Sequence, residues 1–481
     1  MQLKKELKEA LISSLLGKYA LYVFQILSLM ILARVFNPEV FGLIAVTQVF
    51  IMFFQMLATS GLGPAIVYKE SISKDMLNGV FTFTLILGSA LAIVFFFISD
   101  FLYQWLDLSS GLTVFYLMAP TVFFSSLCIV PLACLQKDAQ FKTIARAEIF
   151  AEFLALVACL LLLQVLDAEN ALASKFVCVA ILRFVFYYLF SRKTTLGTPN
   201  FGSQVRLAAP LFAFAKYQLG FNILNFFSRN LDNLLVAKYF GVASLGVYEK
   251  TYQVMKYPLQ LFTFAITPAL QPIFTRYKDD KSIVCHEYAY ITEKLGLLGA
   301  FSAFILFWAA EPVVYILFGE KWHESAQFLR ILSLSIPIQM VLSSTGGVFQ
   351  AFGETKALFK CGLFGTSANV SAIILGIMSD NLSLLCFYLI ISFSLNFVQC
   401  FFTMFYTVFT FKELGKMKRS FIFVAVPFIN FLFIDINFQV VLDLKDAFIR
   451  VSVIAFLSAI ALVVTYIVVY PSSGIKNLLK R

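Results

Sequence analysis

The chain has 481 residues, of which 60% are hydrophobic and only 13% are charged, and its mean hydropathy is +0.87. No soluble domain has that balance, so the composition indicates a polytopic helical membrane protein. The net charge of +10 does not indicate a nucleic-acid partner, because the basic residues are distributed as in a membrane protein.

Fourteen apolar runs are long enough to cross about 30 Å of hydrocarbon, which predicts an all-α fold of about 14 transmembrane helices. The thirteenth run is interrupted by Pro427 and Asp435. The connections are short and leave no room for a soluble domain. The predicted spans are 11–33, 40–66, 78–98, 112–134, 144–166, 171–190, 208–238, 243–273, 290–310, 326–350, 357–378, 384–410, 420–441 and 448–470.

The Lys and Arg residues predict the orientation of these spans. With a cytoplasmic N-terminus, 23 of the 37 Lys and Arg residues fall on the inside and six on the outside, and the other eight lie within spans. Basic residues concentrate on the cytoplasmic side of membrane proteins. We therefore predict a multi-pass membrane protein with both termini in the cytoplasm.

The sequence also repeats itself. ARVFNPEVFG at 33–42 corresponds to AKYFGVASLG at 237–246, an offset of 204, and a weaker echo relates 136–142 to 350–356 at an offset of 214. Six predicted helices separate the copies, so both copies enter the membrane from the same side. This predicts a parallel repeat about an axis along the membrane normal.

The repeat divides the chain into parts. We predict a six-helix N-lobe over 1–200, a six-helix C-lobe over 201–415, and two accessory helices over 416–481. The stretch 192–204, with three Gly or Pro residues, is the expected linker.

A polar stripe follows one face of the predicted helix 208–238. Its members recur at intervals of four, three, four and three, within an arc of roughly 80°. They are Gln218, Asn222, Asn225, Arg229 and Asp232. Because a charge facing lipid costs roughly 2.5–3.5 kcal/mol, the stripe predicts a polar cavity inside the membrane. The alternative is a self-satisfied Arg229–Asp232 pair at a helix contact, and the two can coexist.

The repeat offset carries this stripe onto the first helix, where four of the five positions are again polar. The matching residues are Ser14, Lys18, Leu21, Gln25 and Ser28. The helices that follow add polar faces of their own, with Gln48, Gln55 and Thr59 in one and Tyr248, Tyr252, Lys256 and Thr263 in the other. Matched polar faces in both halves predict a central path for a substrate.

At these residues the chain resembles a known family. LARVFNPEVFGLIAVTQVF at 32–50 and SRNLDNLLVAKYFGVASLGVYEKTYQ at 228–253 are similar to the polysaccharide-transporter, Wzx-type flippase branch of the multidrug/oligosaccharidyl-lipid/polysaccharide exporter superfamily. The resemblance implies a protein of the bacterial inner membrane with two six-helix lobes in a V around a central cavity, plus two accessory helices. It also implies transfer of undecaprenyl-diphosphate-linked repeat units to the outer leaflet for O-antigen or exopolysaccharide biosynthesis. That activity would use alternating access, with glycosyltransferases and a polymerase as partners.

Such a cargo needs cations for its diphosphate and amides or aromatic rings for its sugars. The expected substrate-binding residues are Lys18, Gln25, Gln218, Asn222, Asn225, Arg229, Asp232, Tyr252 and Lys256. Secondary candidates are Lys216, Lys250, Gln48 and Gln55. We expect Lys250 to be compensated by Glu249, Arg183 to form a structural pair with Glu152, and Lys175 and Lys294 to reach the membrane surface from span ends.

No metal site is expected, since the eight cysteines form no CxxC pair, and no cofactor is expected beyond a coupling cation, H⁺ or Na⁺, near Asp232. The sequence has no HExxH, P-loop or GxSxG motif, so we expect no enzyme. Two alternatives remain: an antiporter of drugs or flippase of a lipid-linked peptidoglycan precursor with the same fold, and a membrane O-antigen polymerase or acyltransferase. A purely structural scaffold is disfavoured by the duplicated polar faces.

Overall fold

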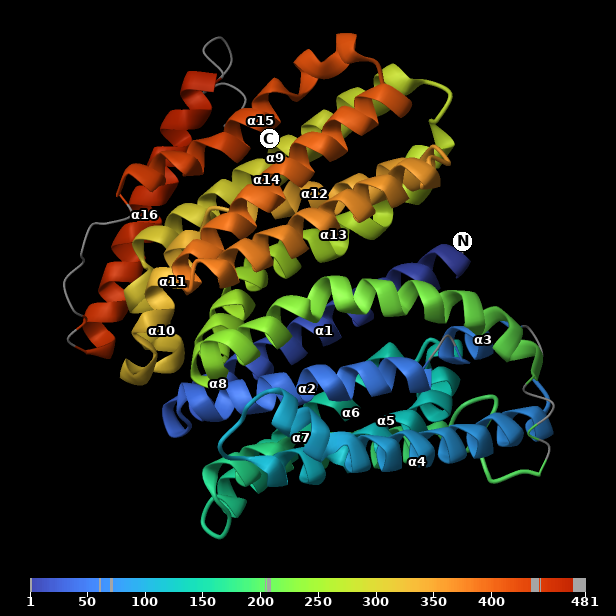
Figure 1. Cartoon of the computed structure of the whole chain (residues 1–481). Helices are drawn as coiled ribbons and strands as arrows, with labels where there is room; N and C mark the ends of the chain where they lie inside the picture. Colours follow the sequence, from blue (N-terminus) through green and yellow to red (C-terminus); the bar gives the residue numbers. More distant parts are fainter. Residues whose placement is uncertain are drawn as a thin grey trace. The chain divides into compact units, whose positions relative to one another are not determined.

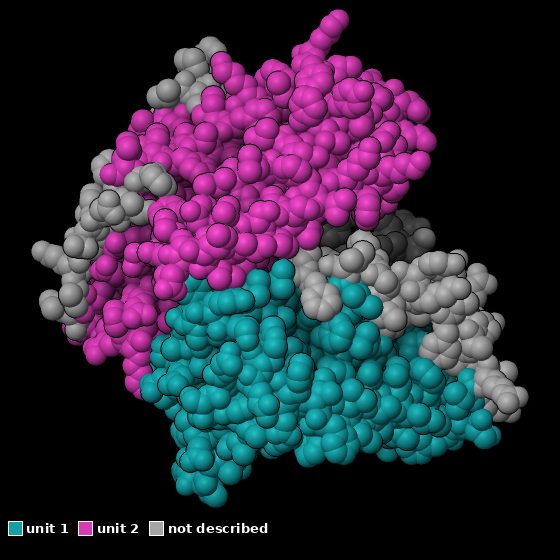
Figure 2. Space-filling view, viewed as in Figure 1, with its two compact units in different colours: residues 1–246 teal, residues 247–481 magenta. Residues whose placement is uncertain are grey.

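The computed structural model of the chain contains helices and no strand in the residues that it describes, which are 2–59, 62–69, 72–203, 205, 209–433, 441 and 443–469 (Figure 1). This confirms the predicted all-α fold. By compactness the chain forms two units, unit 1 over residues 1–246 and unit 2 over residues 247–481 (Figure 2). The division into lobes 1–200, 201–415 and 416–481 stays a prediction.

The helices of unit 1 are α1 (Gln2–Val35), α2 (Pro38–Thr59), α3 (Leu62–Tyr68), α4 (Lys74–Trp105), α5 (Leu112–Lys137), α6 (Phe141–Leu162), α7 (Ala168–Ser191) and the first part of α8 (Ala209–Arg276). The remainder of α8 opens unit 2. It is followed by α9 (Lys281–Trp308), α10 (Ala310–Phe318), η2 (Glu320–Trp322), α11 (Glu324–Ser333), α12 (Ile336–Ala351), α13 (Thr355–Met378), α14 (Leu382–Thr407), η3 (Phe411–Met417), α15 (Lys418–Ala425), η4 (Val426–Phe433) and α16 (Leu444–Val469).

Each predicted span overlaps a helix. Among the described residues, nine helices are long and apolar enough to cross a membrane, or ten if α11 and α12, which are bent by 52°, form one broken span. The chain is therefore a multi-pass membrane protein. The count of 14 stays a prediction, because α6, the two parts of α8 and the α15–η4 segment are not among those nine.

Two stretches differ from the expected spans. In 420–441 the α-helix ends at Ala425 and a 3₁₀-helix follows, since Pro427 has no backbone N–H to donate inside an α-helix. Asp435 lies outside the described residues. The expected loop after residue 310 instead contains α10, whose first turn holds Glu311 and Pro312. An acid and a proline in the first turn are ordinary helix-start signals.

Each unit has a central helix. In unit 1, α5 packs between α4 and α7. The approach of α4 to α5 is close, since a Cβ on Gly88 would lie 2.6 Å from the Ser126 Cβ and 3.3 Å from the Phe123 carbonyl oxygen. The Ser126 hydroxyl donates to the Thr84 carbonyl at 2.8 Å. In unit 2, α9 packs against α12 and α15, with Gly299 lying on the backbone of Pro337. Small residues at helix contacts are how membrane helices gain close packing.

The helix breaks follow the 204-residue repeat. α1 and α2 are separated at Phe36 and Asn37, and the equivalent positions are Phe240 and Gly241. Gly241 interrupts α8 with φ 82° and ψ 165°, a conformation that favours glycine. Because the 68 residues of α8 would span about 100 Å as one straight helix, this break separates the two predicted spans 208–238 and 243–273.

The repeat also appears as a reciprocal contact within unit 1. A Cβ on Gly42 would lie 1.6 Å from the carbonyl oxygen of Val242, and a Cβ on Gly246 would lie 2.0 Å from that of Pro38. Gly42 and Gly246 are repeat equivalents, and so are Pro38 and Val242. Gly42 thus approaches Val242, and Gly246 approaches Pro38, the repeat equivalent of Val242. A pseudo-twofold axis produces such a reciprocal contact.

The weaker echo has a structural counterpart as well. Ala139, between α5 and α6, and Gly353, between α12 and α13, are related by the offset of 214. Both have positive φ, 52° and 76° respectively. The same turn therefore joins the equivalent helices in each half, and only one copy has the glycine that this conformation favours.

Candidate functional site

The structure separates the intramembrane cations into two groups. Lys18, Arg229 and Lys256, the three ranked first for a diphosphate, are exposed. The paired group contains Lys175, Arg183, Lys250 and Lys294, each within 4.0 Å of a carboxylate oxygen. The side chain of Lys216 lies outside the described residues. An exposed cation in an apolar span must reach water or a polar partner, because lipid does not solvate it.

Glu152 on α6 holds two of the paired cations. Its carboxylate accepts from Arg183 at 3.1 Å and from Lys175 at 3.1 Å, both on α7. The pair of Glu152 with Arg183 that the sequence predicts is therefore present in the structure. Lys175 differs from expectation: its side chain is 12% exposed and held inward against the carboxylate, so it does not reach the membrane surface. This network joins α6 to α7 and takes both cations away from any cargo.

The polar face of α1 lies beside its contact with α6. Gly17 packs on Ala145, and the Phe24 and Phe153 rings meet edge to face at 6.3 Å, so residues 17 and 24 mark the face toward α6. Lys18 and Gln25 have the same spacing of seven and are rotated by about 100° from that face. Lys18 is exposed and Gln25 is half-buried. The sequence-predicted pair therefore shares a face that α6 does not occupy.

The two candidates on α2 have different surroundings. The Gln55 amide donates to the Ser125 hydroxyl of α5 at 2.9 Å, which makes it a link between helices. The Gln48 side chain is half-buried, and its amide oxygen is buried with no protein hydrogen-bond partner. A buried polar atom left in this state is a site for a water or a ligand donor. Of the two, Gln48 fits a binding role better. The Thr59 side chain lies outside the described residues.

The first part of α8 carries the strongest sequence stripe, and the structure describes only one end of it. Arg229 is exposed and Asp232 is half-buried. The Phe226 ring meets Phe53 of α2 at 5.5 Å between centroids, which packs this part of α8 against α2. The side chains of Gln218, Asn222 and Asn225 lie outside the described residues, and their roles stay predictions.

The second part of α8 presents an aromatic and cationic row in unit 2. Tyr248 and Tyr252 lie 5.6 Å apart between ring centroids, and the Lys256 ammonium sits 4.3 Å from the centre of the Tyr252 ring. These residues are four apart, so they share one helix face. The ring holds the ammonium by a cation–π contact while Lys256 stays exposed. Tyr248 is fully buried, so the accessible part of the row is the Lys256 ammonium beside the half-buried Tyr252 ring, which suits a phosphate next to a sugar.

Lys250 belongs to a different environment on the same helix segment. Its ammonium lies 2.6 Å from the carboxylate of Glu249 and 3.3 Å from the Gln253 side-chain oxygen. Its side chain is mostly buried. The expected compensation of Lys250 by Glu249 is therefore present in the structure, and this lysine is a weaker candidate for cargo than Lys256.

Metal binding finds no support in the described part of the chain, where no group of three or more His, Cys, Asp or Glu side chains could hold a metal ion. The eight cysteines are free thiols. Among the described residues, the candidates of unit 1 are cations and amides, and those of unit 2 are Lys256 and its tyrosine row. Side chains of these kinds can bind and orient an anion.

Sequence reasoning missed one feature of this region of the protein, a cavity of about 990 Å³ in unit 2 that contains Lys294. The Lys294 ammonium lies over the Tyr290 ring at 5.1 Å and near the Tyr466 ring at 5.6 Å, and its expected reach to the membrane surface stays a prediction. The i,i+4 spacing of Tyr290 and Lys294 was the available signal. The contribution of Tyr466, 172 positions further on, had none.

Comparisons with known proteins place this geometry in context. The sequence profile of the family described as polysaccharide biosynthesis protein matches residues 31–327. The teichuronic acid biosynthesis protein TuaB of Bacillus subtilis (strain 168) is 23% identical over 316 residues, which are 64% of this chain and 63% of that protein. The succinoglycan biosynthesis transport protein ExoT of Rhizobium meliloti (strain 1021) is 25% identical over 370 residues, 77% of this chain and 74% of that protein. The lipopolysaccharide biosynthesis protein WzxC of Escherichia coli (strain K12) is 24% identical over 354 residues, 72% and 70%.

Solved structures with the same fold include the lipid II flippase MurJ in an inward closed conformation. The TM-score is 0.75 at 13% identity, covering 98% of this chain and 100% of that chain. An inward-facing multidrug resistance MATE family transporter of the MOP superfamily gives a TM-score of 0.64 at 16% identity, covering 83% and 96%. The fold of the chain is that of these membrane transporters.

Proposed function

The chain belongs to the polysaccharide biosynthesis protein family, and on that premise we propose that it is a flippase for lipid-linked oligosaccharides. It moves undecaprenyl-diphosphate-linked repeat units from the cytoplasmic to the outer leaflet of the bacterial inner membrane. Both termini are cytoplasmic in this proposal. The names of the relatives support it, since one is a succinoglycan biosynthesis transport protein and another is a lipopolysaccharide biosynthesis protein.

The observation that carries the proposal is the exposure of three cations, Lys18, Arg229 and Lys256, on otherwise apolar helices. A diphosphate that crosses bare hydrocarbon faces a prohibitive cost of desolvation. Exposed cations replace part of its hydration, and Arg adds bidentate hydrogen bonds to phosphate oxygens. Tyr252 and the amides of the polar faces then contact the sugars.

The proposed mechanism is alternating access of one central cavity, first from the cytoplasm and then from the outside. Asp232 lies one turn from Arg229, so its negative charge weakens the binding of the diphosphate by the arginine. The same carboxylate offers a site for a coupling cation, H⁺ or Na⁺. No other cofactor takes part. Glycosyltransferases supply the cargo on the inner side and a polymerase consumes it on the outer side. The cargo is released without any change to its covalent bonds, so the protein is a transporter and not an enzyme.

The test is the substitution of each exposed cation by Ala in cells that depend on this gene for surface polysaccharide. Losing one charged hydrogen bond costs about 1.5–3 kcal/mol, which is roughly a 10- to 150-fold loss of cargo affinity. Lys18→Ala and Arg229→Ala should abolish surface polysaccharide and accumulate the lipid-linked repeat unit in the inner leaflet. Arg229→Lys should retain part of the activity.

The matched control is Lys412→Ala, an exposed lysine of η3 outside the candidate site. It should leave export unchanged, and protein level in the membrane should be equal in all variants. Full export by the triple Ala variant of Lys18, Arg229 and Lys256 would rule out the cationic site. Accumulation of single repeat units outside the cell would indicate a polymerase instead.

The likeness to the lipid II flippase favours one other candidate, transfer of a lipid-linked peptidoglycan precursor, because that structure matches over nearly the whole of both chains. The two functions differ only in the sugar and peptide carried on the same lipid diphosphate. Depleting the protein separates them: loss of surface polysaccharide with normal cell-wall synthesis supports the oligosaccharide, and cell lysis supports the precursor.

A further inference from the structure

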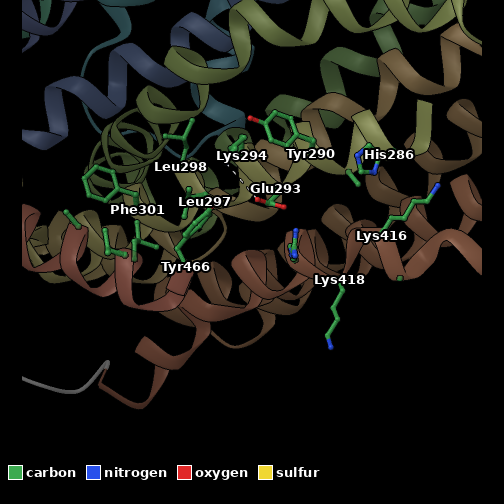
Figure 3. Close-up of a pocket in the computed structure, with 16 residues that line it drawn as sticks. His286, Tyr290, Glu293, Lys294, Leu297, Leu298, Phe301, Lys416, Lys418 and Tyr466 are labelled. Carbon is green, nitrogen blue, oxygen red and sulfur yellow. Dashed lines mark ion pairs between the residues drawn. The ribbon is translucent and has the colours of Figure 1, made fainter. Parts of the chain in front are cut away.

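Unit 2 contains a cavity that takes no part in the proposed transport path. It measures about 990 Å³ and lies between α9, the η3–α15 segment and α16. Figure 3 shows the labelled side chains around it, with Glu293 and Lys294 near its centre. All of its lining residues belong to unit 2, so it is described within one compact body.

The polar end of the cavity has an excess of positive charge. Its lining includes Lys294, Lys416, Lys418 and Arg419 against a single carboxylate, that of Glu293. Lys416 is oriented by the Ser282 hydroxyl at 2.9 Å and by Glu413 at 3.0 Å, while Lys418 extends away from the Glu293–Lys294 pair in Figure 3. Lys294 and Arg419 are therefore the cations best placed to meet an anion inside the cavity.

Lys294 is held in place rather than left mobile. Its ammonium lies 3.9 Å from Glu293, whose side chain is 8% exposed, and it is flanked by the rings of Tyr290 and Tyr466. Aromatic faces hold an ammonium without neutralising it. The 3.9 Å separation is too long for a hydrogen bond, so this carboxylate does not use up the donors of the ammonium.

The cavity becomes apolar along α9 and α16. Leu297, Leu298 and Phe301 follow Lys294 on α9, and Leu462 and Val463 face the cavity from α16. From Lys294 to Phe301 the helix rises about 10 Å, a substantial part of one bilayer leaflet. The cavity thus offers a basic end followed by an apolar stretch about 10 Å long. On the predicted topology the basic end faces the cytoplasm.

We propose that this cavity binds one anionic phospholipid of the inner leaflet, with its phosphate at Lys294 and Arg419 and an acyl chain along the apolar residues. Basic pockets between membrane helices on the cytoplasmic side have this property in general. The cations lie at one end and the apolar residues continue from it along α9 and α16, an arrangement that fits a single phosphate joined to an acyl chain. The occupant is therefore a phospholipid, whose small headgroup needs no sugar contacts, and the site supports the α9–α15–α16 packing.

The experiment uses the delipidated full-length protein in detergent and native mass spectrometry with added lipids. Phosphatidylglycerol should bind at least tenfold more tightly than the zwitterionic phosphatidylethanolamine, and inorganic phosphate should not displace it. Arg419→Gln should weaken phosphatidylglycerol binding at least tenfold, and so should the double change of Lys294→Met with Glu293→Gln. The double change is used because it leaves no buried carboxylate without its cation.

Two variants control for folding and for general charge. Lys294→Arg keeps the charge and should retain binding, and Lys412→Gln removes an exposed η3 lysine outside the cavity and should leave binding unchanged. Equal phosphatidylglycerol affinity in the wild type, in Arg419→Gln and in the double variant would overturn the proposal. So would undecaprenyl diphosphate that competes with phosphatidylglycerol and loses affinity in the same variants, since the site would then belong to the cargo. Neither result bears on whether the wild-type protein exports the oligosaccharide. The lipid site and the proposed function are therefore tested separately.

Discussion

Gly42→Ala tests whether the reciprocal glycine contact is essential to the conformation in this structure. A Cβ at this position would lie 1.6 Å from the Val242 carbonyl oxygen and 2.9 Å from the Gly246 nitrogen. Both neighbours are backbone atoms, so no side-chain rotation can make room. To restore an ordinary contact of 3.4 Å, the two helices must separate by about 1.8 Å.

The cost of this separation sets the magnitude. Overpacking a well-packed contact costs typically about 1–3 kcal/mol, and a rigid backbone neighbour places the change at the upper end. In a transporter with two conformations, a bias of that size shifts their ratio by roughly 5- to 150-fold. The Gly42→Ala variant should therefore populate the conformation of this structure much less. That shift blocks the transport cycle even though the substrate-binding residues are not altered.

The assay combines thermal unfolding of the purified protein in detergent with surface polysaccharide in cells. We expect Gly42→Ala to lower both, and Gly246→Ala to have a similar effect because the contact is reciprocal. Gly362→Ala on α13 is the control, since a Cβ there meets nothing within 4 Å. If Gly42→Ala unfolds at the wild-type temperature and exports fully, the contact is not a constraint on the cycle and this reasoning is refuted.

Two further predictions concern stability. Ala139→Gly should raise the free energy of unfolding by about 1 kcal/mol and Gly353→Ala should lower it by a similar amount, because both positions have positive φ. Thermal unfolding of the two variants measures these opposite shifts. Shifts of the same sign would contradict the shared turn. Glu152→Gln should destabilise the protein by about 3 kcal/mol, because it leaves two cations of α7 without their carboxylate, whereas Glu287→Gln at an exposed position should change little; equal unfolding temperatures would show that the network is not structural.

Much of the fold could be predicted because its signals are local. Apolar runs located the helices, and the offset of 204 anticipated both the break at Gly241 and the equivalence of Gly42 with Gly246. Equal depth from the inner ends of two neighbouring spans was enough to relate Glu152 to Arg183. Each of these inferences uses spacing along one helix or between adjacent helices, where geometry follows directly from sequence.

The rest depends on contacts that sequence spacing does not reveal. Lys175 lies two turns from Arg183 on α7, and only the packing of α6 on α7 shows that one carboxylate serves both cations. The cavity around Lys294 needs Tyr466 from the last helix. Hydropathy also treats lipid-facing and buried residues alike, so it did not show that Tyr248 is fully buried while Lys256, on the same helix face, is exposed.

The measurement that tests the central claim most directly is transfer of a defined lipid-linked oligosaccharide in reconstituted vesicles. Purified protein is inserted into liposomes that contain undecaprenyl-diphosphate-linked repeat units with a fluorescent sugar, and a membrane-impermeant quencher reports the units on the outer surface. We predict that the protected fraction becomes accessible over time with the wild type and stays protected with the Lys18, Arg229 and Lys256 triple Ala variant. Equal transfer by the triple variant, or none by the wild type under a proton or sodium gradient, would contradict the account.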